Sequence, residues 1–280
     1  MTDETAPTLF VVGTPIGNLG DLTPRAVDTF RTVELIACED TRRTSKLLRH
    51  AGIARTRFVV VNEHTERDAI PVVLATLAGG ASVALVSDAG MPVVSDPGHL
   101  VIGAAIEAGV RLEVVPGPSA ALAALVLSGL AGDRFCFEGF VPRKGAERTR
   151  RLAAIATEPR TTVLFEAPHR LARTLEELRA RAGDERSVAV ARELTKLHEE
   201  VWRTTLGEAA ALAAMGEPRG EHVVVLGGAP ALDVDDDAIV AAVQRSLAQG
   251  LSRRDATDAV STELAVSRNR VYALAVAVDQ

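Results

Sequence analysis

Aromatic residues and cysteine are both scarce in this chain. Aromatic residues make up 3% of its 280 positions, and the two cysteines are Cys38 and Cys136. So few rings disfavour an RNA-binding surface built on base stacking. The cysteines stand too far apart for a metal-binding or disulfide motif, so we expect buried, reduced thiols and no metal site.

Long hydrophobic runs and an excess of positive charge are also missing. The longest apolar stretch, residues 120–127, is too short to cross a bilayer, and no basic and apolar leader follows Met1. We therefore expect a cytoplasmic protein. The formal net charge of −6 disfavours attraction of nucleic acid to the whole surface, so a polyanion has to meet a local basic patch.

The remaining composition is that of a folded α/β protein. Apolar residues make up 47% and charged residues 24%, and short β-branched runs alternate with amphipathic segments, the pattern of a mostly parallel sheet covered by helices. A first series has predicted strands at 9–12, 35–38, 58–61, 83–86 and 112–115, with helices at 24–31, 44–50, 67–77 and 100–108. A second series has predicted strands at 135–137, 162–165, 188–191, 201–206 and 222–226. The strand at 201–206 follows its predecessor too closely for a crossover, so part of this second sheet should be antiparallel.

These series predict three parts of the chain. They are an N-terminal α/β domain (1–118), a second α/β domain (119–229), and an acidic linker with a helical tail (230–280). Within the tail, segments 252–264 and 267–278 each begin with a serine that can cap a helix, which resembles a helix-turn-helix. Arg268 and Arg270 are placed to touch phosphates, but from residue 229 onward eight acids stand against five bases. RNA contact and a packing role both stay open for the tail.

Two turn-rich loops follow predicted buried strands in the first domain. The loop at 87–98 reads SDAGMPVVSDPG, and the loop at 116–120 reads PGPSA. Glycine and proline let main chain approach a ligand closely, and ligands of open α/β sheets bind beyond the carboxyl ends of the strands. We therefore expect a small polar ligand held mainly by backbone. The loop at 13–20 has neither the dinucleotide glycine pattern nor the lysine of a P-loop.

Six motifs occur in one order along the chain: TPIGNLGDLTPRA, CEDTRRTSKLL, LVSDAGMPVVSDPG, VVPGPSA, RFCFEGFVPRKG and ARELTK. This series resembles the tetrapyrrole-methylase-fold superfamily and, within it, the ribosomal small-subunit RNA 2'-O-ribose methyltransferase I family, over about residues 9–226. The resemblance implies S-adenosylmethionine bound in a cleft between two α/β domains, and a homodimer. It also implies methylation of the ribose 2'-hydroxyl of a cytidine in the decoding region of 16S ribosomal RNA.

The resemblance also implies which residues bind the cofactor, because the family's cofactor-binding positions can be matched to positions of this sequence. Asp88 takes the acidic place of the superfamily's glycine-aspartate-proline loop, and Pro15 closes the first loop over the cofactor. The other implied cofactor-binding residues are Met91, Pro92, Val93, Ser119, Ala120, Phe165, Leu194, Glu221, His222 and Val223.

Methyl transfer to a hydroxyl requires in-line positioning and is helped by a base that takes the hydroxyl proton. The candidates are polar residues at strand ends that face the expected cleft: Glu39, Asp40, Glu63, His64, Glu166, His169, Glu193 and Lys196. Of these, Glu39, Asp40, His64, Glu166 and Lys196 are the expected catalytic residues, and which of the five is the base stays open. For residues 39–43, a surface salt-bridge network is the alternative.

Two basic clusters, at residues 42–49 and 143–151, are expected to contact phosphates, which fixes register without reading bases. The expected RNA-binding residues are Arg42, Arg43, Arg143, Lys144 and Arg170. Two other functions stay open: C-methylation of a tetrapyrrole in corrinoid synthesis, and a non-catalytic RNA-binding assembly factor. The basic clusters and the helical tail favour RNA as the substrate.

Overall fold

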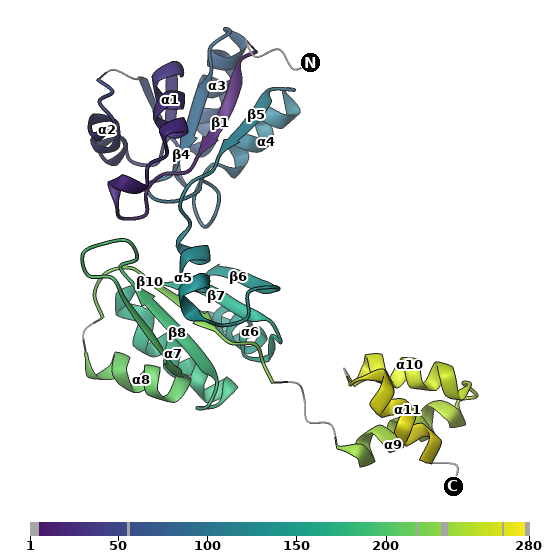
Figure 1. The fold of residues 1–280 in the computed structure, drawn as a ribbon. Helices are drawn as coiled ribbons and strands as arrows, with labels where there is room; N and C mark the ends of the chain where they lie inside the picture. The colour runs from purple at the N-terminus through teal and green to yellow at the C-terminus, as the bar shows by residue number, and fades with distance from the viewer. Residues whose placement is uncertain (1–5, 55–56, 217, 231–234, 265, 278–280) are drawn as a thin grey trace. The chain divides into compact units, whose positions relative to one another are not determined.

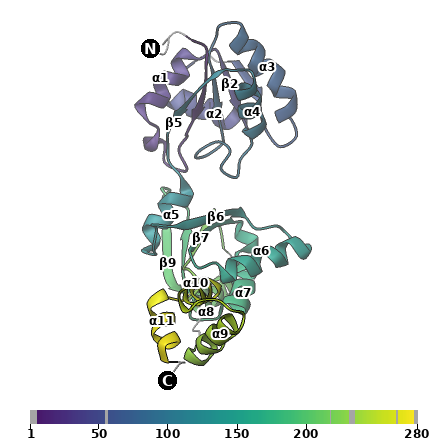
Figure 2. The ribbon, with the colours of Figure 1, turned by 90° about the vertical axis from the view of Figure 1, so that its right-hand side faces the viewer.

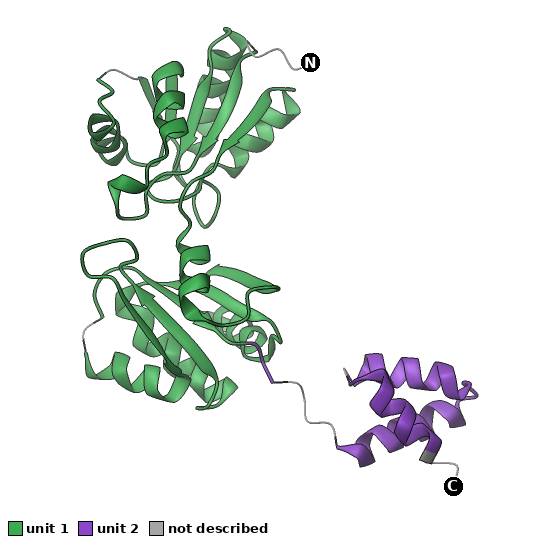
Figure 3. Cartoon of the chain, viewed as in Figure 1, with its two compact units in different colours: residues 1–227 green, residues 228–280 purple. Residues whose placement is uncertain are grey.

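The computed structural model describes residues 6–54, 57–216, 218–230, 235–264 and 266–277. The chain divides into two compact units, residues 1–227 and 228–280 (Figure 3). The first unit holds two five-stranded sheets. Residues 116–119 connect the last strand of the first sheet to the helix that begins at Ala120.

The first sheet is parallel throughout. Its strands are β1 (Thr8–Val12), β2 (Leu35–Cys38), β3 (Arg57–Val60), β4 (Val83–Val86) and β5 (Arg111–Val115), in the order β3-β2-β4-β1-β5. Apolar residues occupy every position of β2 and β4, and all of them are buried, as expected where helices cover both faces of a sheet. The parallel sheet predicted from the strand pattern is confirmed.

Two helices cover each face of this sheet (Figures 1 and 2). Helices α1 (Pro24–Thr32) and α2 (Thr41–His50) pack on one face through Phe30, Leu47 and Leu48. Helices α3 (Glu66–Ala78) and α4 (His99–Glu107) pack on the other through Val73 and Val101. A short 3-10 helix, η1 (Leu19–Asp21), lies between β1 and α1.

The second sheet is mixed. It contains β6 (Phe135–Phe140), β7 (Thr161–Glu166), β8 (Ser187–Arg192), β9 (Glu200–Thr205) and β10 (His222–Leu226), in the order β6-β7-β10-β8-β9. Strands β6 and β7 are parallel, whereas β10 is antiparallel to β7 and β8, and β9 is antiparallel to β8. The predicted antiparallel part is thus confirmed.

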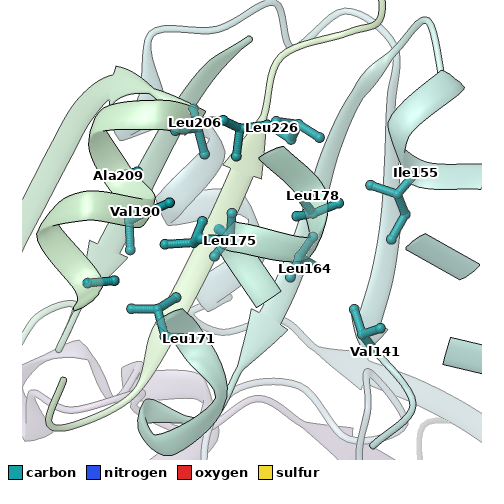
Figure 4. Close-up of a cluster of buried hydrophobic side chains, with 14 of the residues drawn as sticks. Val141, Ile155, Leu164, Leu171, Leu175, Leu178, Val190, Leu206, Ala209 and Leu226 are labelled. Carbon is teal, nitrogen blue, oxygen red and sulfur yellow. The ribbon is translucent and has the colours of Figure 1, made fainter. Parts of the chain in front are cut away.

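Helices also cover both faces of the second sheet. On one face lie α6 (Gly145–Thr157), α7 (Pro168–Ala182) and α8 (Leu206–Met215). Figure 4 shows Leu171, Leu175 and Leu178 of α7 pointing toward the strands, among Leu164 and Val190. Helix α5 (Ala120–Ser128) packs on the opposite face. The longest apolar run of the sequence is therefore a helix with one buried face, through Ala121, Ala124 and Leu125, while Leu122 and Val126 are exposed.

Local capping and a bulge explain where element boundaries differ from the sequence prediction. Helix α2 begins at Thr41 rather than 44, because the Asp40 side chain accepts the Arg42 amide and caps it. Strand β6 continues past 137 through a bulge between Phe137 and Gly139, and Gly139 has φ +58°. A positive φ at a bulge suits glycine.

Cys38 is buried as expected, but Cys136 is only half-buried.

The second unit contains three helices with a core of their own. They are α9 (Asp236–Ala248), α10 (Arg253–Glu263) and α11 (Arg268–Ala277), and Ile239, Val260 and Val271 are fully buried among them. Ser252 caps α10 as predicted. Residues 231–234 of the expected linker lie outside the described residues. Among the described residues, no helix is both long and apolar enough to cross a membrane.

Candidate active site

The loops after β1, β4 and β5 meet at one edge of the first sheet. Thr14 and Gly90 form an antiparallel bridge, with Thr14 N donating to Gly90 O at 2.8 Å and Gly90 N donating to Thr14 O at 3.1 Å. A Cβ on Gly13 would lie 2.6 Å from Gly117 N and from Met91 Sδ. Because no side chain fits there, glycine is what lets the three loops come together.

The loop from 87 to 98 is held from outside by Glu66. One carboxylate oxygen of Glu66, Oε1, accepts three amides at the start of α4: Gly98 N at 3.0 Å, Leu100 N at 2.7 Å and Val101 N at 3.2 Å. Helix α4 has no side-chain cap of its own. The loop also holds Val93 and Ser95 at φ of 75° and 66°, a left-handed conformation that persists only where the surroundings impose it.

A cavity of about 330 Å³ opens beside these loops, within the range of small-molecule sites. Both sheets contribute to its walls. Its lining residues are Ile16, Ala89, Gly90, Met91, Val94, Ser95, Asp96, Ser119, Ala120, Phe140, Phe165, Glu166, Ala167, Pro168, Leu194, Glu221, His222 and Val223. We call it the apolar cavity, because most of these side chains are apolar.

Three carboxylates line the apolar cavity, and two of them have cationic partners outside its wall: Glu166 pairs with Arg170 at 3.0 Å and Glu221 with Lys196 at 2.7 Å. Asp96, Glu166 and Glu221 line it, and the described residues of its wall include no lysine or arginine. Burial raises the pKa of Asp96 to about 6; Glu39 and Asp88 add to the shift, and Ser87 opposes it by a hydrogen bond. Burial also lowers the pKa of His222, so this imidazole is neutral at pH 7. Such a wall suits a ligand that is apolar and cationic.

A second cavity, of about 370 Å³, shares Ile16, Ala89 and Glu221 with the first. We call it the basic cavity, because three cations line it. Its other lining residues are Thr14, Pro15, Gly17, Leu19, Arg43, Thr44, Lys46, Leu47, Ser87, Asp88 and Lys196. The two cavities are therefore neighbours, and only the second has cations, together with the carboxylates of Asp88 and Glu221, among its described lining residues.

The structure distributes the expected cofactor-binding residues over these two cavities. Eight of them line the apolar cavity: Met91, Ser119, Ala120, Phe165, Leu194, Glu221, His222 and Val223. Pro15 and Asp88 line the basic cavity. Pro92 and Val93 line neither cavity. Asp88 accepts the Asp40 amide at 3.1 Å and forms an ion pair with Arg43 at 3.4 Å.

Several candidate bases already have firm partners. Glu166 is buried, where it accepts from Thr174 and pairs with Arg170 at 3.0 Å. Hydrogen bonds from Arg42 lower the pKa of Asp40 to about 2. His64 is exposed beside Glu63, at 3.3 Å. The candidates that line neither cavity are Glu39, Asp40, Glu63, His64, His169 and Glu193.

Two further candidates respond to burial in opposite ways. Burial, together with the charge of Asp88, raises the pKa of Glu39. Burial acts to lower the pKa of Lys196, but the Glu193 and Glu221 carboxylates, at 2.8 and 2.7 Å, outweigh it and raise that pKa. Lys196 is therefore a cation at neutral pH and can donate but not accept a proton.

The expected RNA-binding residues differ in exposure. Arg42, Arg43, Arg143 and Lys144 are exposed, and the described residues supply no ion-pair partner for Arg143 or Lys144. The Arg170 side chain is 15% exposed and donates to Val141 O. Arg148 of the second basic cluster is buried against Glu177, Thr174 and Pro142 O, so it is not available to a phosphate.

Some residues of the apolar cavity were not expected from the sequence. Asp96 is the main omission, although it stands in the same loop as Asp88 and repeats the Ser-Asp pair of Ser87 and Asp88. Ile16 and Phe140 are also lining residues that were not expected. The repeated Ser-Asp pair was the one available signal.

The chain has two α/β sheets and a cavity lined from both, and a family comparison identifies its class as the tetrapyrrole methylases. The model of Tetrapyrrole (Corrin/Porphyrin) Methylases matches residues 8–210. Among solved structures, the methyltransferase CobJ is similar with a TM-score of 0.62 and 23% identity, over 82% of this chain and 98% of that one. Uroporphyrin-III C-methyltransferase of Thermus thermophilus, complexed with S-adenosylhomocysteine, has a TM-score of 0.56 and 20% identity over 79% and 97%. These structures share the fold.

Closer relatives narrow the class. Ribosomal RNA small subunit methyltransferase I of Synechocystis sp. is 44% identical over 97% of this chain and 98% of its own length. The protein of that name in Haemophilus influenzae is 40% identical over 97% of each chain, and that of Escherichia coli O157:H7 is 44% identical over 83% and 82%. The chain therefore belongs to the ribosomal RNA small subunit methyltransferase I family of tetrapyrrole-methylase-fold enzymes.

Proposed function

We propose that this chain transfers the methyl group of S-adenosylmethionine to the ribose 2'-hydroxyl of a cytidine in the decoding region of 16S ribosomal RNA. The observation that carries the cofactor assignment is the apolar cavity with three carboxylates and, among its described lining residues, no lysine or arginine. S-adenosylmethionine has an apolar thioether chain and adenine, a positively charged sulfur and an ammonium group. A phosphate-bearing cofactor would meet repulsion from these carboxylates.

The residues of the apolar cavity fit this cofactor group by group. Phe140 and Phe165 form an aromatic pair with ring centroids 5.5 Å apart, and Leu194 and Val223 add apolar surface for the adenosine. Asp96 and Glu221 supply carboxylates for the cationic groups. Bound there, S-adenosylmethionine supplies a methyl group that is already activated on sulfur.

RNA as the acceptor is supported by the relatives' names and by the exposed arginines and lysine of the two basic clusters. Arg42, Arg43, Arg143 and Lys144 are exposed cations that can bind phosphates without reading bases. The ribosomal substrate places the protein in the cytoplasm. A homodimer is part of the same proposal, by resemblance to the family.

The proton of the ribose hydroxyl requires an acceptor. Burial raises the pKa of Glu39, with the charge of Asp88 second, and burial raises that of Asp88 against the opposing charge of Arg43. A carboxylate with a raised pKa is a better proton acceptor at neutral pH, and of these two only Asp88 lines a cavity, the basic one. Lys196, a cation held by Glu193 and Glu221, positions Glu221 between the two cavities.

The direct test is methyl transfer in vitro. Purified protein is incubated with methyl-labelled S-adenosylmethionine and small ribosomal subunits from a strain that lacks this enzyme, and the RNA is digested for nucleoside mass spectrometry. We expect label in 2'-O-methylcytidine. A parallel reaction with uroporphyrinogen tests the tetrapyrrole alternative. Label in the tetrapyrrole, on a base, or in no product would contradict the proposal.

A further inference from the structure

The position of the basic cavity is fixed relative to the apolar cavity. The shared residues Ile16, Ala89 and Glu221 form a common boundary. At that boundary Gly17 has no room for a side chain, because a Cβ would lie 2.4 Å from Lys196 Cγ and 3.0 Å from Leu194 O. The loop after β1 and the loop after β8 are therefore in close contact, and what binds in one cavity faces the other.

The charges of the basic cavity are unequally compensated. Lys196 is neutralised by Glu193 and Glu221, and Arg43 is paired with Asp88 at 3.4 Å. Lys46, one helical turn along α2 from Arg43, is exposed, and the described residues give it no ion-pair partner. The basic cavity thus presents the ammonium group of Lys46, which has no ion-pair partner among the described residues, and the guanidinium of Arg43, which has further N–H donors besides those that face Asp88.

An RNA strand places a phosphate beside each ribose hydroxyl. In-line transfer requires the acceptor hydroxyl at the boundary with the cofactor's cavity. The phosphate attached to the neighbouring 3'-oxygen then lies next to that boundary, which is where the basic cavity holds Arg43 and Lys46. A phosphate binds to ammonium and guanidinium groups through charge-assisted hydrogen bonds.

We propose that the basic cavity is the subsite for the target nucleotide, and that Lys46 and Arg43 bind its 3'-phosphate. This inference rests on the proposed function, since it takes RNA as the methyl acceptor. It adds a residue, Lys46, that orients the reacting ribose as well as holding the strand. The exposed Arg143 and Lys144, which line neither cavity, contact other phosphates.

The test compares two cations of the same helix. Lys46 lines the basic cavity, whereas Arg49, also exposed on α2, lines a different cavity with Glu34 and Phe58. Lys46→Ala, Lys46→Arg and Arg49→Ala are each assayed on small ribosomal subunits at saturating S-adenosylmethionine over a series of salt concentrations. Calorimetry of S-adenosylmethionine binding is the control for the fold and for the apolar cavity.

We expect Lys46→Ala to raise the KM for subunits by about tenfold or more, and to reduce the salt slope of subunit binding by about one. Lys46→Arg keeps the charge and restores most of the loss. Arg49→Ala should raise the KM for subunits less than Lys46→Ala does, because Arg49 acts only through long-range charge. All three variants should keep the affinity for S-adenosylmethionine within about twofold.

Every other outcome contradicts the proposed subsite, the proposed function, or both. If the unaltered protein methylates subunits and Lys46→Ala behaves like Arg49→Ala, the subsite is wrong and the proposed function stands. If Lys46→Ala lowers cofactor affinity as much as subunit affinity, Lys46 acts on the apolar cavity instead. If the unaltered protein transfers no methyl group to subunits, the subsite and the proposed function fail together.

Discussion

At the residue scale, the proposed binding role of Asp96 comes with a cost to stability. It lines the apolar cavity as a carboxylate whose pKa burial raises from 3.8 to about 6. An acid with a raised pKa in the folded protein destabilises it above that pKa, and the effect disappears as the pH falls through 6 toward 3.8. A cation bound beside Asp96 would stabilise its ionised form and so offset this loss of stability. Binding of a cationic ligand is thus a physical reason for an acid at this position.

We therefore predict opposite effects of Asp96→Asn on stability and on binding. At pH 7.5 the cofactor-free variant should unfold on the order of 2–4 °C above the unaltered protein, and the gain should vanish near pH 4. Its affinity for S-adenosylmethionine should fall about tenfold or more. Thermal unfolding from pH 4 to 8 and calorimetry measure both. Exposed Asp68→Asn is the control, and equal cofactor affinity in the two variants would remove Asp96 from the site.

The sequence singled out Asp88 but not Asp96, although Asp96 is the one of the two that lines the apolar cavity. Asp88 and Asp96 stand eight positions apart in one loop, and each follows a serine. Which of them faces the apolar cavity depends on the Thr14–Gly90 bridge and on the left-handed residues Val93 and Ser95, which turn the loop back on itself. Such folding depends on contacts far apart in the sequence, and local patterns do not contain it.

At the element scale, the clearest sequence signals gave the most accurate boundaries. Strands β2 and β4 and the start of α1 agree with prediction, because runs of buried apolar residues and a Thr23-Pro24 start are local signals. The end of β6 was missed because Gly139 suggests a turn, whereas here it forms a bulge that lets the strand continue.

Glu66 ties two elements together and supports the cavity loop from outside. It stands at the start of α3 and binds three amides at the start of α4. Glu66→Ala should lower the free energy of unfolding by about 1.5–3 kcal/mol, because a buried charge-assisted cap is lost. Glu66→Gln should lose less, since it keeps one acceptor oxygen. Urea unfolding measures both.

A matched control lies on the same helix. Asp68 is exposed in the first turn of α3, and Asp68→Ala should change stability by less than about 0.5 kcal/mol. We also expect Glu66→Ala to weaken S-adenosylmethionine binding, because residues 94–96 line the apolar cavity. Equal stability of the Glu66→Ala and Asp68→Ala variants would show that the three hydrogen bonds do not hold this loop.

At the scale of the whole molecule, the proposed function depends on two neighbouring cavities, one lined by carboxylates without lysine or arginine among its described residues and one lined by three cations and two carboxylates. The chain's net charge of −6 gives no hint of this, because it averages over the molecule. The helical unit 228–280 has its own core, and two of its arginines, Arg268 and Arg270, are in ion pairs with Asp258 and Asp236. These are exposed ion pairs, which contribute little, so a packing role and RNA contact both stay open for that unit.

The most direct test of the whole account is a crystal structure of the protein with S-adenosylmethionine. The account predicts density for the cofactor in the apolar cavity, with its cationic groups at Asp96 or Glu221 and its methyl group directed toward the basic cavity lined by Arg43 and Lys46. Cofactor density at another place, or a methyl group directed away from the basic cavity, would contradict it.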